Sequence, residues 1–162
     1  MKSSSLFQPI KIGSIEVKNK ISMAPMGAFG LVDSDSCYNQ RAIDYYVERA
    51  KGGVGLIITS ITKVENELDQ VVPGIIPITS INPGRFIMTS SEMTERVHSY
   101  GSKIFLQLTM GFGRSGAPGT LLTSQPVSAS SVPNYWDPTV TCRELTTSEV
   151  EWIVAKFIQG AA

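Results

Sequence analysis

The residue whose type and setting point most directly to chemistry is Gln107, a lone amide within the apolar run 104–108. A polar side chain inside such a strand costs free energy unless its hydrogen bonds are satisfied. An amide donates and accepts at once, which suits the edge of a heterocycle with alternating carbonyl and N–H groups. The alternative is that the amide bonds neighbouring backbone, and the spacing does not choose between the two.

A glycine-rich turn follows, with Gly111 and Gly113 on either side of Phe112 and with Arg114 directly after them. Glycines permit a tight, exposed turn. The guanidinium of Arg114 could bind a carboxylate or a phosphate. The pattern is weak by itself, because ordinary surface loops contain it too.

A second candidate lies where the short apolar run 21–24 ends on Pro25. Proline removes a backbone donor and fixes φ, so an irregular turn is expected at this strand end. The backbone of Ala24, Pro25, Met26 and Gly27 could meet a flat ring, with the thioether of Met26 as a polarizable contact. An ordinary strand-ending turn is the alternative.

Thr59 and Ser60 end a third apolar run, 54–59, and we expect them on the same rim as Gln107. Runs without alternation are typical of parallel strands that are buried on both faces. In α/β folds, ligands bind at the carboxyl ends of such strands. Three strand ends that carry a turn, two hydroxyls and an amide therefore predict one shared binding site.

Helices and turns separate these strands. Apolar residues recur with helical spacing in 40–51 and in 85–100, which predicts a helix after each of the first two strands. The segment 11–17 alternates apolar and polar residues around a Gly-Ser pair, which predicts a β-hairpin ahead of the first strand.

The last part of the chain contains a long aperiodic stretch and one more helix. Segments 63–83 and 109–145 are rich in breakers, and we expect them to be loops. Thr146 and Glu149 form a capping box, which predicts the start of a helix that continues to the end of the sequence.

This order of elements predicts an α/β fold, the N-terminal portion of a (β/α)8 TIM barrel with a leading β-hairpin. Such a barrel needs about 250 residues, whereas the sequence has 162. We therefore expect one incomplete domain, 1–162, truncated before strand 4. The alternative is a small open α/β domain that is complete at this length.

Composition excludes several classes of function. Fourteen basic residues balance fourteen acidic ones, so the charge favours neither nucleic acid nor a membrane as a partner. No apolar run approaches the roughly 20 residues that cross a bilayer, and the start does not resemble a signal peptide. Cys37, Cys142 and His98 lack partners at metal-ligand spacing. We expect a cytoplasmic protein without a metal site.

Seven short stretches match one family in the expected order. They are LFQPI at 6–10, VKNKI at 17–21, APM at 24–26, GGVGLII at 52–58, HSYG at 98–101, FLQL at 105–108 and RELT at 143–146. Taken together, they resemble the N-terminal half of the Old Yellow Enzyme family of FMN-dependent ene-reductases (NADH:flavin oxidoreductases). The GFGR variant at 111–114 is most similar to the subgroup of 2-enoate, 2,4-dienoyl-CoA and bile-acid reductases.

The resemblance implies that FMN binds at the carboxyl ends of the barrel strands. Ala24, Pro25 and Met26 would then pack on the flavin through backbone contacts. Ser60 or Ile61 would line its edge, and Gln107 would bond its pyrimidine portion. Many relatives carry Thr or Cys at the position of Gly27, where that side chain tunes the flavin, and glycine cannot do so.

The resemblance also implies a ping-pong reaction. NADH or NADPH would pass a hydride to FMN, and the flavin N5 would deliver it to the β-carbon of an unsaturated carbonyl or enoyl substrate. Longer members of the family add further domains, which implies a 4Fe-4S cluster and FAD in a longer parent protein. The family's substrate-anchoring histidines follow strand 4, so no catalytic residue is assigned to this sequence.

Two classes of function are therefore open. In the first, the chain is part of a flavin-dependent oxidoreductase, and the 162-residue piece is itself inactive. In the second, it is a non-catalytic half-barrel that acts by assembling with itself, as a homo-oligomer, or with another chain. The edge of strand 104–108 and the loop 109–145 would then form the interface.

Overall fold

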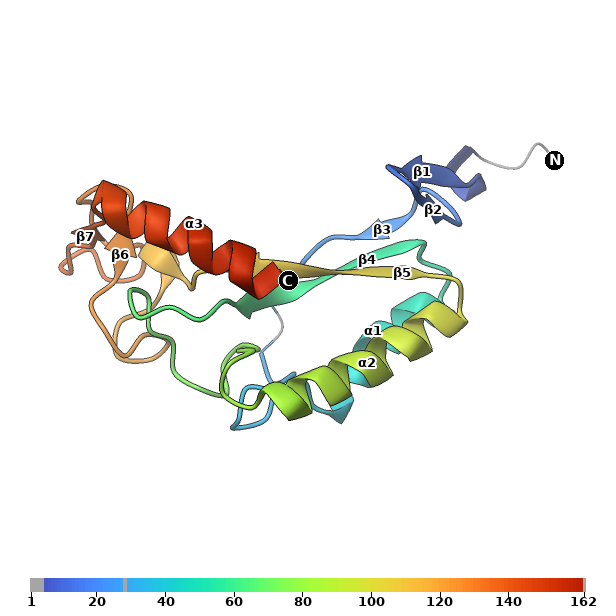
Figure 1. The fold of residues 1–162 in the computed structure, drawn as a ribbon, viewed down its shortest axis with the longest axis horizontal. Helices are drawn as coiled ribbons and strands as arrows, with labels where there is room; N and C mark the ends of the chain where they lie inside the picture. The colour runs from blue at the N-terminus through green and yellow to red at the C-terminus, as the bar shows by residue number, and fades with distance from the viewer. Residues whose placement is uncertain (1–4, 28, 162) are drawn as a thin grey trace.

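The computed structural model describes residues 5–27 and 29–161, so the expected domain is described except for residues 1–4, 28 and 162. These residues form a three-stranded parallel sheet, two small two-stranded sheets and three α-helices (Figure 1). The strands are β1 (Ile10–Ile12), β2 (Ile15–Val17), β3 (Ser22–Met23), β4 (Leu56–Lys63), β5 (Lys103–Thr109), β6 (Val127–Ser128) and β7 (Arg143–Glu144). The helices are α1 (Gln40–Lys51), α2 (Pro83–Ser99) and α3 (Thr147–Ala161), and 3-10 turns lie at Ser5–Phe7 and Gly113–Ser115.

The main sheet has the order β3–β4–β5. Met23 pairs with Ile57 of β4, and Ile57 pairs in turn with Ile104 of β5, both in parallel. Parallel neighbours need a long crossover. The helices α1 and α2 lie within these crossovers, on one side of the sheet (Figure 1). We call that side the helix face and the opposite side the inner face.

The helix α1 has the predicted bounds because both of its ends are capped. The Asn39 side chain accepts a hydrogen bond from the Ala42 N–H at 3.1 Å, which satisfies one of the free amides of the first turn. Gly53 follows the helix with a φ of +97°, a conformation that favours glycine. The helix α2 begins two residues earlier than predicted, since Asn82 caps it and Pro83 suits the first helical position.

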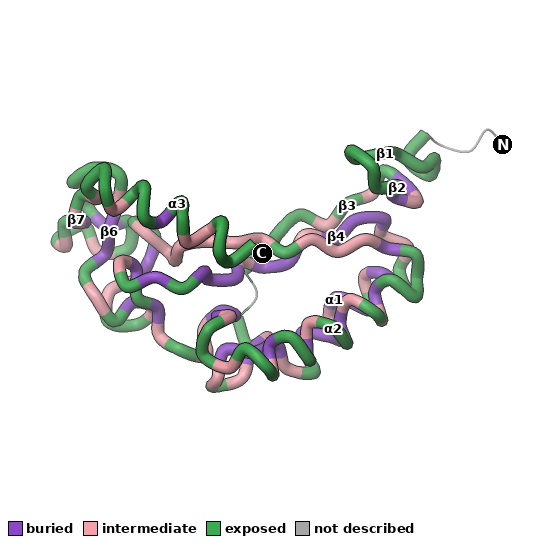
Figure 2. Tube along the Cα trace, viewed as in Figure 1, coloured by how far each residue is buried: buried purple, intermediate pink, exposed green. Residues whose placement is uncertain are grey.

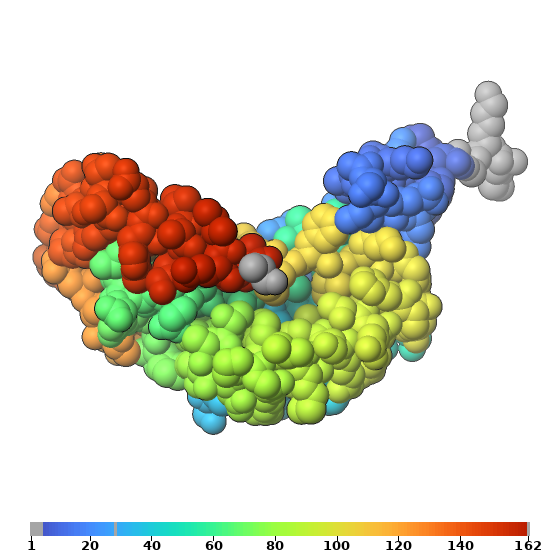
Figure 3. Space-filling model, viewed as in Figure 1, coloured from blue at the N-terminus to red at the C-terminus, as the bar shows by residue number. Residues whose placement is uncertain are grey.

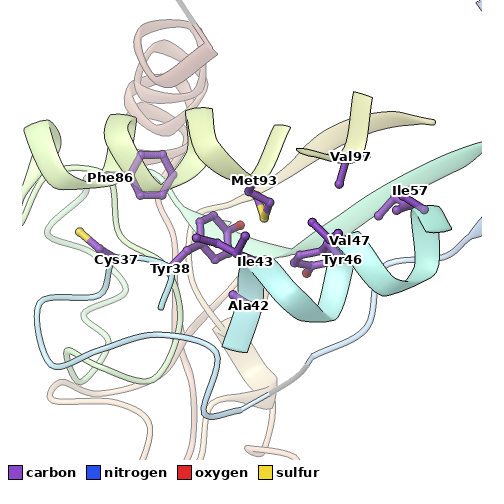
Figure 4. Close-up of a cluster of buried hydrophobic side chains, with 11 residues drawn as sticks. Cys37, Tyr38, Ala42, Ile43, Tyr46, Val47, Ile57, Phe86, Met93 and Val97 are labelled. Carbon is purple, nitrogen blue, oxygen red and sulfur yellow. The ribbon is translucent and has the colours of Figure 1, made fainter. Parts of the chain in front are cut away.

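The hydrophobic core lies between these two helices and the sheet. Ile43 and Tyr46 of α1 face Met93 and Val97 of α2, and Ile57 of β4 completes the contact from the sheet (Figure 4). The buried positions of α1 and α2 lie along the sides that face inward, while their outer sides are exposed (Figure 2). The amphipathic spacing in the sequence therefore places both helices on the same face of the sheet.

The predicted hairpin is confirmed as β1 and β2, which pair antiparallel through a two-residue turn. Gly13, the first of the two turn residues, has a φ of +58°, and type II′ hairpins carry glycine at this position. The hairpin lies beside the start of β3, at the amino end of the sheet (Figure 1). Ile10 and Ile12 line a cavity of about 180 Å³ there, together with Leu56 of β4.

Asn19 ties the segment before β3 to the start of β4. Its side-chain amide donates to the Gly53 carbonyl at 2.8 Å, and its Oδ1 accepts from the Ile21 N–H at 3.0 Å. Gly55 packs so closely against Asn19 that an added Cβ would lie 2.5 Å from Oδ1 and 2.8 Å from the backbone oxygen. The stretches that contain Asn19 and Gly55 therefore meet in space and set where β4 begins.

The helix α3 begins at the predicted capping box. The Glu149 carboxylate accepts from the Thr146 N–H at 2.8 Å, and the Thr146 hydroxyl accepts from the Glu149 N–H at 3.3 Å. Arg143 adds two hydrogen bonds to the same carboxylate, at 2.9 and 3.0 Å. Together these contacts lower the pKa of Glu149 to about 2, with the Arg143 hydrogen bond as the largest cause.

Two strand boundaries and one burial pattern differ from the sequence prediction. The strand expected at 54–59 starts at Leu56 and continues to Lys63, because its last three residues, 61–63, pair with residues 107–109 of β5. Thr59 and Ser60 therefore lie inside β4 and do not end it. The strand β5 is half-buried rather than buried, and Leu106 is 45% exposed, since β5 is an edge of the described sheet.

The expected loop 109–145 contains some regular structure. Val127 and Ser128 of β6 pair in parallel with Arg143 and Glu144 of β7. Asn134 is buried, and its side-chain amide donates to the carbonyls of Arg114 and Gly116 at 2.8 Å each. The loop is therefore held to the turn after β5. Among the described helices, none combines the length and the apolar character needed to cross a membrane.

The substitution Gly55→Ala should lower the free energy of unfolding by about 1–3 kcal/mol, because its methyl group would overlap Asn19. Gly84→Ala is the matched control, since nothing lies within 4 Å of the added Cβ in the first turn of α2. Alanine there should leave stability unchanged or raise it by up to about 1 kcal/mol. Denaturant unfolding of the three proteins measures both effects, and equal losses in both variants would contradict the close packing.

The depressed pKa of Glu149 predicts a pH dependence. A carboxyl group whose pKa is lower in the folded state contributes stability above its unfolded pKa and loses it as pH falls through the folded value. The advantage of wild type over Glu149→Gln should therefore be full above pH 4.5 and disappear as pH falls towards 2. Unfolding curves at a series of pH values test this, with Glu151→Gln, an exposed carboxylate on α3, as the control. A constant difference over the whole pH range would contradict it.

Candidate functional site

The inner face of the sheet carries two of the predicted site residues opposite each other. Ile104 and Leu106 line a cavity with Phe86 and Met93 of α2, so they point to the helix face. Side chains alternate along a strand, which places Gln107 on the inner face. Ile61 of β4 is the register partner of Gln107 and shares that face.

Gln107 is half-buried, and no described residue hydrogen-bonds to its side-chain amide. Its backbone N–H donates to the Thr59 hydroxyl at 3.1 Å. The structure therefore brings Thr59 and Gln107 together through the backbone N–H of Gln107 and not through its side chain. The amide side chain is left with its donors and its acceptor directed at the inner face.

Ser60 and Ile61 have different environments, although they are neighbours. Ser60 is buried, and its backbone N–H donates to the Tyr46 hydroxyl at 2.8 Å. Ile61 is half-buried and packs against a second apolar cluster formed by Val71, Ile76, Ile78 and Leu122, together with Phe112 and Ile75. Of the two, Ile61 is the register partner of Gln107 in β5.

The segment from Ala24 to Gly27 follows β3 and is exposed throughout, and Met26 presents more than half of its surface. The strand β4 lies between β3 and β5, so this segment lies on the β3 side of Ile61, whereas Gln107 lies on the β5 side. An added Cβ at Gly27 would meet no atom within 4 Å. This segment lies at the carboxyl end of β3, where an open stretch of backbone is available to a ligand. We call Ala24–Gly27, Ser60, Ile61 and Gln107 the candidate site.

The surface over the inner face is concave. Figure 3 shows it hollowed between the N-terminal hairpin and α3, on the side of the sheet away from α1 and α2. The candidate residues are apolar or uncharged, with one free amide and exposed backbone. A flat heterocycle whose edge alternates donors and acceptors fits such a set, so the residues present fit the isoalloxazine ring of FMN.

The glycine turn after β5 packs against Asp69, a contact that the sequence did not predict. An added Cβ at Gly111 would lie 2.5 Å from Cγ of Asp69, and the Gly113 N–H donates to Oδ2 of Asp69. The turn is half-buried and closes over this carboxylate, so it is not the exposed turn that the sequence predicted. Arg114 is exposed and donates from Nε to the Pro133 carbonyl at 2.8 Å.

Asp69 and Lys63 form a buried polar group beside the candidate site. Asp69 is 1% exposed, and its Oδ1 has no hydrogen-bond partner among the described residues. Burial raises the pKa of this carboxyl. Lys63 is 4% exposed and donates to the carbonyls of Val64 and Asn66 at 3.3 and 3.1 Å, and burial lowers its pKa. Neither residue stands out in the sequence, because a charged residue after a strand is normally read as solvated.

A cavity of about 740 Å³ on another part of the surface is a poorer candidate. It lies between the loop at 30–41 and α2, and its wall includes Arg85. The Arg85 guanidinium is already bound by Asp33 and Asp35, which raise its pKa. Within the described residues, no cluster of three or more His, Cys, Asp or Glu side chains could hold a metal ion.

Two relatives cover nearly all of this chain. The cinnamate reductase of Clostridium sporogenes is 50% identical over 156 residues, which is 96% of this chain and 23% of that protein. The NADH oxidase of Thermoanaerobacter brockii is 40% identical over 157 residues, again 23% of its length. The chain therefore spans about a quarter of these relatives.

Solved structures give the same result for the fold. The Old Yellow Enzyme homologue from Zymomonas mobilis superposes with a TM-score of 0.73 at 31% identity, over 95% of this chain and 43% of that one. Morphinone reductase in complex with tetrahydroNAD gives a TM-score of 0.71 at 28% identity, over 98% and 46%. The α/β fold described above is thus part of the Old Yellow Enzyme barrel. The sequence model of one flavin-enzyme family matches residues 5–162, and this chain belongs to that family, the NADH:flavin oxidoreductase / NADH oxidase family.

Proposed function

We propose that this chain is the N-terminal part of an FMN-dependent ene-reductase. Membership of the flavin oxidoreductase family supports the cofactor class. The amide of Gln107 carries the proposal, because this half-buried residue lies on the inner face and its side-chain amide has no described hydrogen-bond partner. A polar group held in this way loses free energy unless a ligand or water completes its hydrogen bonds.

The chain's own residues would bind and orient the cofactor. FMN, when bound, would supply a hydride that originates from NADH or NADPH to the β-carbon of an activated alkene, and an acid not assigned among this chain's residues would protonate the α-carbon. Gln107 would donate to and accept from the pyrimidine edge of the flavin. Ile61 would exclude water on the same face, and Ala24, Pro25 and Met26 would contact the ring from the end of β3.

The substrate we propose is a small α,β-unsaturated carbonyl or enoyl compound. Cinnamate, the compound in the name of the relative at 50% identity, is an α,β-unsaturated acid. The position of Gly27 carries no side chain that could hydrogen-bond a flavin, so any tuning of the cofactor would come from other residues. A longer parent protein would also carry a 4Fe-4S cluster and FAD, as the subgroup resemblance implies.

Gln107→Leu should weaken FMN binding by about tenfold or more in the complete polypeptide that contains this chain, because the side chain keeps its bulk and loses its hydrogen bonds. Gln40→Leu is the matched control, since Gln40 is exposed on α1, outside the candidate site. Flavin fluorescence quenching gives both dissociation constants. Equal FMN affinity in the two variants would contradict the role of Gln107.

Residues 1–162 alone should bind FMN only weakly, because the family's phosphate site is formed by later strands. The test is to express this chain, titrate FMN by fluorescence quenching and record thermal unfolding. Micromolar or tighter binding together with a cooperative unfolding transition would contradict the proposal that the chain is an incomplete barrel. A well-defined dimer at low concentration in size-exclusion chromatography would instead favour a non-catalytic half-barrel that assembles with itself.

A further inference from the structure

The strand β4 contains one more residue than its partner at the point where it reaches the candidate site. Ile58 pairs with Phe105, whereas the next pair is Ile61 with Gln107. Two residues of β4, Thr59 and Ser60, therefore lie opposite the single residue Leu106. This arrangement is a β-bulge, which bends a strand and redirects its side chains, and bulges are frequent beside active sites.

Two hydroxyl groups satisfy the backbone that the bulge displaces. The Ser60 N–H donates to Oη of Tyr46, 2.8 Å away on α1. The Gln107 N–H donates to Oγ1 of Thr59 at 3.1 Å, and that hydroxyl donates to the Ser60 carbonyl at 2.9 Å. Tyr46 is 1% exposed and Thr59 is also buried, so water does not take their place. The bulge therefore depends on side chains from α1 and from β4 itself.

The bulge decides which side chains of β4 face the candidate site. Side chains alternate with a period of two, so a shift of one residue moves every later side chain to the opposite face. Without the extra residue, Ser60 would pair with Gln107, and Ile61 and Lys63 would point towards the helices. Thr62, whose hydroxyl lies 3.2 Å from that of Tyr38 on the helix face, would then point inward.

We propose that Tyr46 and Thr59 are positioning residues for the flavin, which act by holding the β4 bulge so that Ile61 faces Gln107. This inference rests on the proposed function, since it assigns the pair a role only if FMN binds at the candidate site. Neither hydroxyl lies on the inner face. Tyr46 in particular acts from α1, through the backbone of Ser60.

Tyr46→Phe is the main test, because it removes the hydroxyl and keeps the ring in the core. In the complete FMN-binding polypeptide, the dissociation constant of FMN should rise about tenfold, which corresponds to about 1.4 kcal/mol. The visible absorption bands of the bound flavin should shift, and amide hydrogen exchange should become faster in the peptide that covers 58–63. The flavin spectrum reports the environment of the ring, which a loss of stability alone would not change.

Tyr45→Phe is the matched control on the same helix. The Tyr45 ring packs edge-on against Tyr46 and beneath Arg49, and its hydroxyl makes no hydrogen bond with the described residues. Tyr45→Phe should leave the FMN affinity, the absorption spectrum of the bound flavin and the amide hydrogen exchange of 58–63 unchanged. A second pair of variants covers the case in which Tyr46→Phe does not fold. Thr59→Val should reproduce its effects, and Thr59→Ser should restore wild-type behaviour because it keeps Oγ.

The outcomes separate this inference from the function on which it rests. If the wild-type polypeptide does not bind FMN, the proposed function is wrong and the inference is overturned with it. If wild type binds FMN while Tyr46→Phe and Thr59→Val keep its affinity and spectrum, the inference alone is overturned. Faster exchange in 58–63 with an unchanged flavin would show that the hydroxyls stabilise the strand without positioning the cofactor.

Discussion

The fixed position of β4 at both of its ends constrains the rest of the structure. At its start, Gly55 lies against Asn19, and Leu56 pairs with Lys103. At its end, Lys63 pairs with Thr109. Between these two pairs, β4 has eight residues and β5 has seven. The extra residue must be accommodated inside the strand, so the bulge follows from how the two ends are held. It lies beside Gln107, the register partner of Ile61.

A bulge in a buried strand is stable only if its displaced amides find acceptors. In this fold the acceptors are hydroxyls rather than carbonyls, and one of them comes from a helix. Tyr46 belongs to the same buried cluster as Met93 and Val97, so the packing of its ring determines where its hydroxyl accepts from Ser60. Burial raises the pKa of this phenol to about 12, and the group stays neutral at any physiological pH. Core packing and the geometry of the inner face are thus linked through one side chain.

The sequence predicted those features that depend only on residues close together in the chain. The period of α1 and the Thr146–Glu149 capping box need only neighbouring residues, and both are found as predicted. The end of β4 was not predictable in this way, because it depends on pairing with Thr109 of β5, far along the chain. The Gly111 turn was misread for the same reason, since its tight fit involves Asp69. Local periodicity also identified Gln107 as unusual, but its free amide on the inner face required the register with Ile61.

The exposed apolar side chains favour the incomplete barrel over a complete small domain. Leu106 on the edge strand and Val154 and Ile158 on α3 are all exposed. A complete domain normally covers or charges such an edge, because unpaired strands and apolar patches promote association. In a barrel, the edge of β5 would pair with a further strand, and the apolar side of α3 would pack against it. The same further strands would close the inner face, where the candidate site is open. The exposure of these residues and the openness of the site thus have a single physical explanation.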